Sequence, residues 1–181
     1  MPPDGPPGAP GAGLAPRRAG PADARAFAAL ARSEIERGLP HGWTAPRLHR
    51  LLAREDTNAY ALGDASGAIG GLSVATFRTA RAHLTLHAVA PGLRRSGLGS
   101  LLLRWQIEAG LVAGIEAIEL EVRAEDAAAV GFYRAHGFVP GTRVAGYYAR
   151  REDALRMRLA PLGPRAAGGP PAAASPTDPQ R

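Results

Sequence analysis

The sequence has 181 residues, which is enough for one hydrophobic core, and its net charge of +6 comes from arginine without any lysine. The absence of cysteine excludes disulfides, thiolate nucleophiles and cysteine metal sites. The basic residues are scattered rather than clustered with aromatic ones, so we expect no nucleic-acid partner. No apolar run could span a membrane, and the start does not resemble a signal peptide. We therefore expect a soluble, cytoplasmic protein without a membrane partner.

Both ends of the chain are rich in Pro, Gly and Ala and have few large apolar side chains. Such segments bury too little surface to offset the ~1–2 kcal/mol per residue that backbone ordering costs. We therefore predict disordered tails at 1–20 and 162–181, with Arg17 and Arg18 solvated, and one folded domain at 21–161.

Periodicity predicts the elements of this domain. A helix runs from Asp23 to Gly38, and a second helix begins at Thr44. Further along the chain we expect strands at 58–62, 69–77 and 83–89, a helix to about residue 113, a strand at 115–122, a helix at 126–136 and strands near 138–144 and 154–159. This order predicts an α/β (α+β) fold, a mixed sheet with helices on both faces.

The turn between the third strand and the long helix has the features of a phosphate site. Gly97 and Gly99 permit a tight turn and a close approach of the backbone, and the first helical turn offers free N–H groups. Arg94 and Arg95 can pair with phosphate oxygens. We interpret the whole stretch as a pyrophosphate cradle: Arg94, Arg95, Ser96, Gly97, Leu98, Gly99 and Ser100. An ordinary turn with solvated arginines is the alternative.

Residues 117–123 alternate strictly between apolar and charged side chains. Ile118, Leu120 and Val122 share one face of the predicted strand, and Glu119, Glu121 and Arg123 share the other. An interior strand covered on both sides would be apolar on both faces. The charged face therefore meets solvent or a cleft.

Several motifs together resemble the GNAT acetyltransferase superfamily, in particular the bacterial ribosomal-protein-alanine N-acetyltransferases. The resemblance is carried by Arg94-x-x-Gly97-x-Gly99, Glu121-Val122-Arg123, the alanines at 127–129, Tyr133, His136-Gly137-Phe138, Gly146-Tyr147-Tyr148 and residues 151–157. It is detailed over about 82–160, vague over 21–80 and absent in the tails. It implies a mostly antiparallel sheet of six to seven strands and acetyl-CoA as the cofactor.

The resemblance also implies roles for individual residues. Glu121 would be the general base, acting through water, and Tyr133 the general acid for the coenzyme A thiolate. The strand predicted at 83–89 would bulge and separate from its neighbour near Ala88 and Val89, where backbone N–H groups would hold the oxyanion. The backbone from His87 to Val89 would pair with the pantetheine arm.

For several other residues, the sequence is compatible with both a structural and a functional role. Asp126 stands where the family usually has Asn; it can cap a helix, but its contact with the cofactor is in question because a carboxylate only accepts hydrogen bonds. Tyr147, Tyr148 and Trp43 would contact substrate, although Trp43 could equally be a hydrophobic anchor. Likewise, Glu121 could be a solvated carboxylate paired with Arg123, and Tyr133 a core aromatic. His83, His87 and His136 lack a metal-like arrangement and are assigned structural roles.

The sequence thus predicts an acetyl-CoA-dependent N-acetyltransferase for the N-terminal amine of a protein, such as a ribosomal protein. An α-amine of pKa ~8 needs much less help to lose its proton at neutral pH than a lysine of pKa ~10.4. The alternatives are the same chemistry on a small amine (a metabolite, polyamine or drug) and a non-catalytic acyl-CoA-binding module. We expect a monomer or weak dimer.

Overall fold

The computed structural model describes residues 14–64 and 67–160. The helices are α1 (Ala24–Glu34), α2 (Ala45–Leu52), α3 (Leu98–Val112) and α4 (Ala127–Ala135), with short 3₁₀ turns η1 (Pro21–Asp23) and η2 (Pro91–Leu93). The strands are β1 (Ala15–Arg18), β2 (Thr57–Gly63), β3 (Ile69–Phe77), β4 (Arg81–Val89), β5 (Ala117–Arg123), β6 (Val139–Tyr148) and β7 (Glu152–Leu159). Within this part of the chain, no helix combines the length and the apolar character that a membrane crossing requires.

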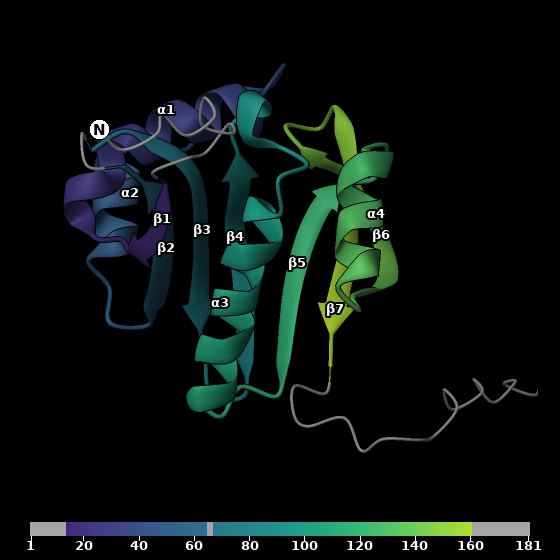
Figure 1. Cartoon of the computed structure of the whole chain (residues 1–181). Helices are drawn as coiled ribbons and strands as arrows, with labels where there is room; N and C mark the ends of the chain where they lie inside the picture. Colours follow the sequence, from purple (N-terminus) through teal and green to yellow (C-terminus); the bar gives the residue numbers. More distant parts are fainter. Residues whose placement is uncertain (1–13, 65–66, 161–181) are drawn as a thin grey trace, which may run out of the picture.

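The described strands form one seven-stranded sheet in the order β1-β2-β3-β4-β5-β7-β6 (Figure 1). In the described sheet β4 and β5 are the one parallel pair, and the other neighbouring strands are antiparallel. The prediction of a mixed, mostly antiparallel sheet is confirmed.

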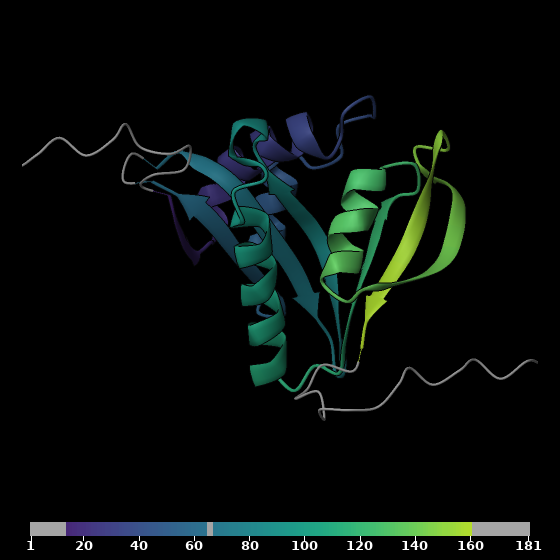
Figure 2. The ribbon, with the colours of Figure 1, turned by 45° about the vertical axis from the view of Figure 1, so that its right-hand side comes forward.

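Helices cover both faces of this sheet, as predicted (Figure 2). The alternation of β2 explains the two layers, because successive side chains of a strand point to opposite faces. Ala59 and Ala61 of β2 pack with α1 and α2 in one core cluster, whose centre includes Phe27. Tyr60 and Leu62 pack on the other face against α3. A third cluster joins α3 and α4 to β5 and β7.

The folded chain begins earlier than the sequence indicated. Residues 14–20 fall in the predicted tail 1–20, yet β1 pairs with β2 along the edge of the sheet. The Arg17 guanidinium forms an ion pair with Asp23 at 2.6 Å, and Arg18 donates to the Asn58 side chain at 3.1 Å, so neither arginine is simply solvated. An edge strand is held by backbone hydrogen bonds and tolerates proline. Its sequence therefore need not show the apolar pattern from which a strand is predicted. Residues 1–13 and 161–181 lie outside the described residues.

The parallel strands β4 and β5 separate along their length. Their pairing runs from Arg81 to His83 on β4 and from Ala117 to Glu119 on β5, and beyond it the two strands diverge (Figures 1 and 2). The register between β3 and β4 shifts so that Thr85 is the extra residue of a β-bulge. The strand separates from its neighbour as expected, but its bulge lies three residues before the predicted Ala88.

Candidate active site

The diverging end of β4 and the N-terminus of α3 border a cleft of about 930 Å³, closed on its other sides by α4 and the end of α1. The predicted cofactor residues that line it are His87, Ala88, Val89, Arg94, Arg95, Gly97, Gly99, Ser100 and Asp126. Ser96 and Leu98 are not among its lining residues. The Ser96 hydroxyl donates instead to the Leu93 carbonyl at 2.6 Å and thereby stabilises the turn.

The turn into α3 is suited to an anionic group. Gly97 precedes the helix with φ +83°, a left-handed conformation that glycine adopts without a steric penalty. The N–H groups of the first helical turn have no carbonyl partner within their own helix, and the positive end of the helix dipole lies behind them. With two arginines beside it, this cradle has the groups that a phosphate-bearing molecule requires.

The two arginines of the cradle differ in their surroundings. Arg94 donates to the Glu34 carboxylate of α1 and, at 3.1 Å, to the Val89 carbonyl. The Glu34 side chain is only 8% exposed. Arg95, which has φ +63°, has no ion pair among the described residues. Arg95 is therefore free to meet a phosphate, whereas Arg94 would have to exchange Glu34 for one.

Tyr133 lies on α4 and lines the same cleft. Its ring packs edge-on against Phe138 and Phe132, and the residue is buried. Burial, followed by the proximity of Tyr148 and Asp126, raises the pKa of Tyr133 well above the ordinary value for a phenol. The hydroxyl is thus protonated at neutral pH and available as a hydrogen-bond donor.

Asp126 caps α4, as predicted. Its Oδ1 accepts a hydrogen bond from the Ala129 N–H at 2.9 Å. The residue also borders the cleft.

His87 is held as a neutral imidazole on the cleft wall. Its Nδ1 lies 3.2 Å from the Ser73 hydroxyl, and its ring stacks on Phe132 at 5.6 Å. Burial and the neighbouring His136 lower the pKa of His87 to about 4. Its Nε2 is buried and has no hydrogen-bond partner among the described residues.

Glu121 lies on the charged face of β5 and does not line this cleft. Its Oε2 is 2.6 Å from Nε2 of His83 on β4, and its Oε1 accepts from Arg156 of β7 at 3.1 Å. The carboxylate is 13% exposed, and the hydrogen bond from His83, with the help of Arg156, lowers its pKa. The suggested pairing with Arg123 is wrong, because Arg123 forms its ion pair with Glu152 at 2.9 Å. His83 is a neighbour that local sequence pattern did not reveal.

Tyr147 and Tyr148 end β6 next to Glu121. The Tyr148 hydroxyl donates to the Glu121 backbone carbonyl at 3.2 Å. Tyr147 is 45% exposed, and partial burial together with the Glu121 carboxylate raises its pKa. Of the two side chains, Tyr147 is the more exposed to an incoming molecule.

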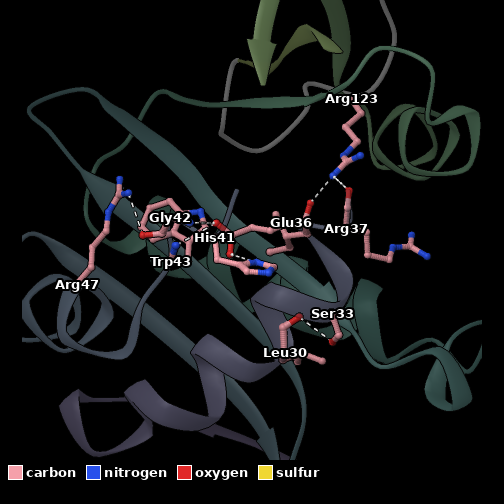
Figure 3. Close-up of polar contacts among 10 residues, drawn as sticks. Leu30, Ser33, Glu36, Arg37, His41, Gly42, Trp43, Arg47 and Arg123 are labelled. Carbon is pink, nitrogen blue, oxygen red and sulfur yellow. Dashed lines mark hydrogen bonds and ion pairs between the residues drawn. The ribbon is translucent and has the colours of Figure 1, made fainter. Parts of the chain in front are cut away.

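Hydrogen bonds from two sides hold the loop between α1 and α2 in place (Figure 3). From within the loop, the buried Glu36 carboxylate accepts a hydrogen bond from the Trp43 N–H at 3.0 Å. From β5, the Arg123 guanidinium donates to the carbonyls of Ile35 at 2.9 Å and Arg37 at 2.7 Å. These contacts place the loop beside the charged face of β5. Neither Glu36 nor this role of Arg123 is evident from the sequence, because Arg123 joins segments far apart in the chain.

Trp43 has the surroundings of an anchor. Its ring packs against the core cluster beneath α1 and α2, and the Arg47 guanidinium lies 4.1 Å from its centroid. These contacts favour the anchor reading over direct contact with substrate.

The sequence matches the model of the Acetyltransferase (GNAT) family over residues 25–138, which is more than half of the chain. The chain belongs to this family. The GNAT match covers the α3 cradle and all the residues that line the cleft.

Curated relatives of this GNAT chain include N-terminal acetyltransferases. Over 75 residues it is 41% identical to the [Ribosomal protein bS18]-alanine N-acetyltransferase of Escherichia coli, covering 40% of this chain and 51% of the relative. Over 96 residues it is 34% identical to the N-terminal acetyltransferase B complex catalytic subunit naa20 of Schizosaccharomyces pombe, covering 51% and 53%. The matches thus span about half the length of these relatives.

Solved structures agree with the family assignment. The crystal structure of the ribosomal-protein-S18-alanine N-acetyltransferase from Escherichia coli superposes with a TM-score of 0.70 at 26% identity, covering 81% of this chain and 92% of that one. The Arabidopsis thaliana NAA60 structure in complex with acetyl-CoA has a TM-score of 0.71 at 14% identity, covering 83% and 99%, and supports the GNAT fold alone.

Proposed function

We propose that this chain is an acetyl-CoA-dependent N-acetyltransferase that modifies the N-terminal α-amine of a protein. The observation that carries the proposal is the cleft at the start of α3, where a helix N-terminus, Arg95 and the separated edge of β4 meet. Similarity to the enzyme that acetylates a ribosomal-protein alanine supports an α-amine as the acceptor. A ribosomal protein is accordingly the first acceptor to test.

The residues proposed to bind the cofactor and those proposed to accept the amine proton lie on opposite faces of the sheet. Bound acetyl-CoA would supply the acetyl group as a thioester, with its diphosphate at the α3 cradle. Tyr133 would donate a hydrogen bond to the departing sulfur. Because its raised pKa lies above that of a thiol, ~8.5, the proton would stay on the tyrosine, which would stabilise the thiolate as a hydrogen-bond donor. Glu121 and its partners would receive the amine proton on the opposite face, next to the point where the pairing of β4 and β5 ends.

The charge of the acceptor face argues for a peptide over a polyamine. Glu119 is paired with Arg81 at 3.5 Å and with Arg158 at 3.4 Å. Glu121 is paired with His83 and Arg156. Each carboxylate is therefore already neutralised, and little negative charge remains to attract a polycation.

Acetylation can be read directly from masses. The protein is incubated with acetyl-CoA and, separately, a ribosomal-protein N-terminal peptide, the same peptide with a blocked N-terminus, and spermidine. We expect one acetyl group on the α-nitrogen of the free peptide and none on the blocked peptide. Acetyl on spermidine alone would reject the peptide acceptor, and the absence of heat on titrating coenzyme A would reject the transferase altogether.

A further inference from the structure

His83 occupies the point where the two central strands part. It is the last residue of β4 paired with β5. Across the gap its Nε2 lies 2.6 Å from Glu121 Oε2, and along its own strand its Nδ1 lies 3.3 Å from the hydroxyl of Thr85, the bulge residue. The imidazole therefore links the two strands at the point where their pairing ends, and its side chain is 43% exposed.

The contact with Glu121 fixes which ring nitrogen of His83 carries the hydrogen in the neutral ring. An ionised carboxylate only accepts hydrogen bonds, so Nε2 of His83 carries the hydrogen between them. In the neutral ring Nδ1 is then the acceptor, with the Thr85 hydroxyl as its neighbour. This is the arrangement of a carboxylate–histidine pair in which the carboxylate sets the tautomer and stabilises the imidazolium that forms on protonation.

Glu121 is less suited to take the proton itself. Both of its oxygens are engaged, one by His83 and one by Arg156. These partners stabilise the ionised carboxylate and so weaken it as a base.

We propose that His83 is the proton acceptor for the incoming α-ammonium group and that Glu121 orients it, an inference that rests on the proposed function. The N–H bond of the ammonium breaks, its electron pair stays on the nitrogen, and the proton passes through one water to Nδ1. The positive charge moves from the amine to the ring, where Glu121 stabilises it. The freed amine can then attack the thioester.

The other charged groups around the ring leave Glu121 as the counter-ion for the imidazolium. Besides Glu121, the charged or titratable side chains that contact the His83–Glu121 pair or lie beside it are Glu119 of β5, Arg156 and Arg158 of β7 and Tyr147 of β6. Glu119 is already paired with two arginines. On its other side, His83 pairs in register with Thr76 of β3, which is uncharged.

The test compares the pH dependence of kcat/KM for the wild type, His83→Gln and the matched control His49→Gln, an exposed position on α2. At pH 7 we expect His83→Gln to be slower by about 10²–10³-fold, in the range typical of a lost general base. The deficit should shrink steadily towards pH 9, because an α-amine of pKa ~8 then sheds its own proton. His49→Gln should match the wild type throughout.

Further measurements separate catalysis from folding and from the proposed function. His83→Ala should recover activity when imidazole is added, and both His83 variants should bind coenzyme A like the wild type. A deficit of the same size at every pH, or a wild-type rate in His83→Gln, would overturn the role of His83. If the wild type acetylates only small amines, the proposed acceptor is wrong, and the same pH comparison with that amine still decides the role of His83.

Discussion

Arg94 and Arg95 are adjacent in the sequence but have different electrostatic surroundings. Arg94 is bound to a buried carboxylate of α1, and Arg95 has no such partner in the described chain. By sequence alone the two are equivalent candidates for pairing with phosphate oxygens. The contact with Glu34 makes Arg94 part of the packing between α1 and the loop as well, so the two side chains can be separated experimentally.

Replacing each arginine by alanine should give distinct results. For Arg95→Ala we expect about tenfold weaker coenzyme A binding, or ~1.4 kcal/mol, with unchanged thermal unfolding. Arg94→Ala should also lose about 1–2 kcal/mol of stability, because Glu34 is left buried without its partner while Arg94 itself is 43% exposed. Calorimetric titration and thermal melts measure the two effects, with the exposed Arg104→Ala on α3 as the control. Equal melting temperatures for both variants would contradict the contribution of Glu34.

Tyr133 can be tested by removing its hydroxyl alone. Tyr133→Phe keeps the ring contacts with Phe132 and Phe138 and should lower kcat by about 100-fold with little change in KM, because the lost donor acts on the leaving sulfur. Steady-state kinetics with a peptide acceptor measures both constants. Tyr60→Phe, a buried tyrosine of β2 packed on Trp105, is the matched control. If Tyr133→Phe turns over at the wild-type rate, the Tyr133 hydroxyl has no catalytic role and the residue serves only in packing.

At the scale of elements, one side chain of β5 organises the segments around the charged face. Arg123 holds the loop after α1 through two carbonyls, pairs with Glu152 at the start of β7 and lies 5.8 Å from the ring of Tyr148. An arginine suits this position because its planar fork can satisfy several acceptors at once. The loop and the end of β6 are thereby fixed relative to the same strand.

Removing the Arg123 contacts should weaken binding of the acceptor peptide more than binding of coenzyme A. For Arg123→Ala we expect KM for a peptide to rise about tenfold, since the orientation of the loop is lost, while the Kd for coenzyme A changes less than twofold. Kinetics at saturating acetyl-CoA and a separate coenzyme A titration distinguish the two. Arg134→Ala, an exposed position on α4, serves as the control. An equal loss in both constants would show that Arg123 supports the whole domain instead.

For the molecule as a whole, local pattern predicted the elements and missed the contacts between them. Helical spacing in α1 predicted a segment close to the one observed, because α1 buries one face in a core. The largely apolar run of β3 did the same, because this interior strand is buried on both faces. The edge strand β1 carries no such signal. The contacts of His83 with Glu121, and of Arg123 with Ile35, join residues far apart in the chain. Only the topology of the sheet brings such pairs together, and their charges alone do not identify the partners.

His87, half-buried in the wall of the cleft, makes the stability of the whole domain depend on pH. Its pKa is about 4 in the folded chain, against ~6.5 for an imidazole in the unfolded chain. Between these values the unfolded state binds the proton more readily, so this contribution is complete above pH 6.5 and is lost as the pH falls towards 4. At pH 5 the loss should reach about 2 kcal/mol relative to pH 7.

Thermal unfolding of the wild type and His87→Leu at pH 7 and pH 5 tests this linkage. The variant has no imidazole at this position, so its melting temperature should fall less on acidification, with a difference of about 4–8 °C between the two proteins. His49→Leu on α2 controls for the removal of an exposed histidine. Because Glu121 and Asp23 also have lowered pKa values, both proteins should lose further stability at lower pH, as these carboxylates become protonated. If the wild type and His87→Leu respond identically between pH 7 and pH 5, His87 is not held neutral by burial.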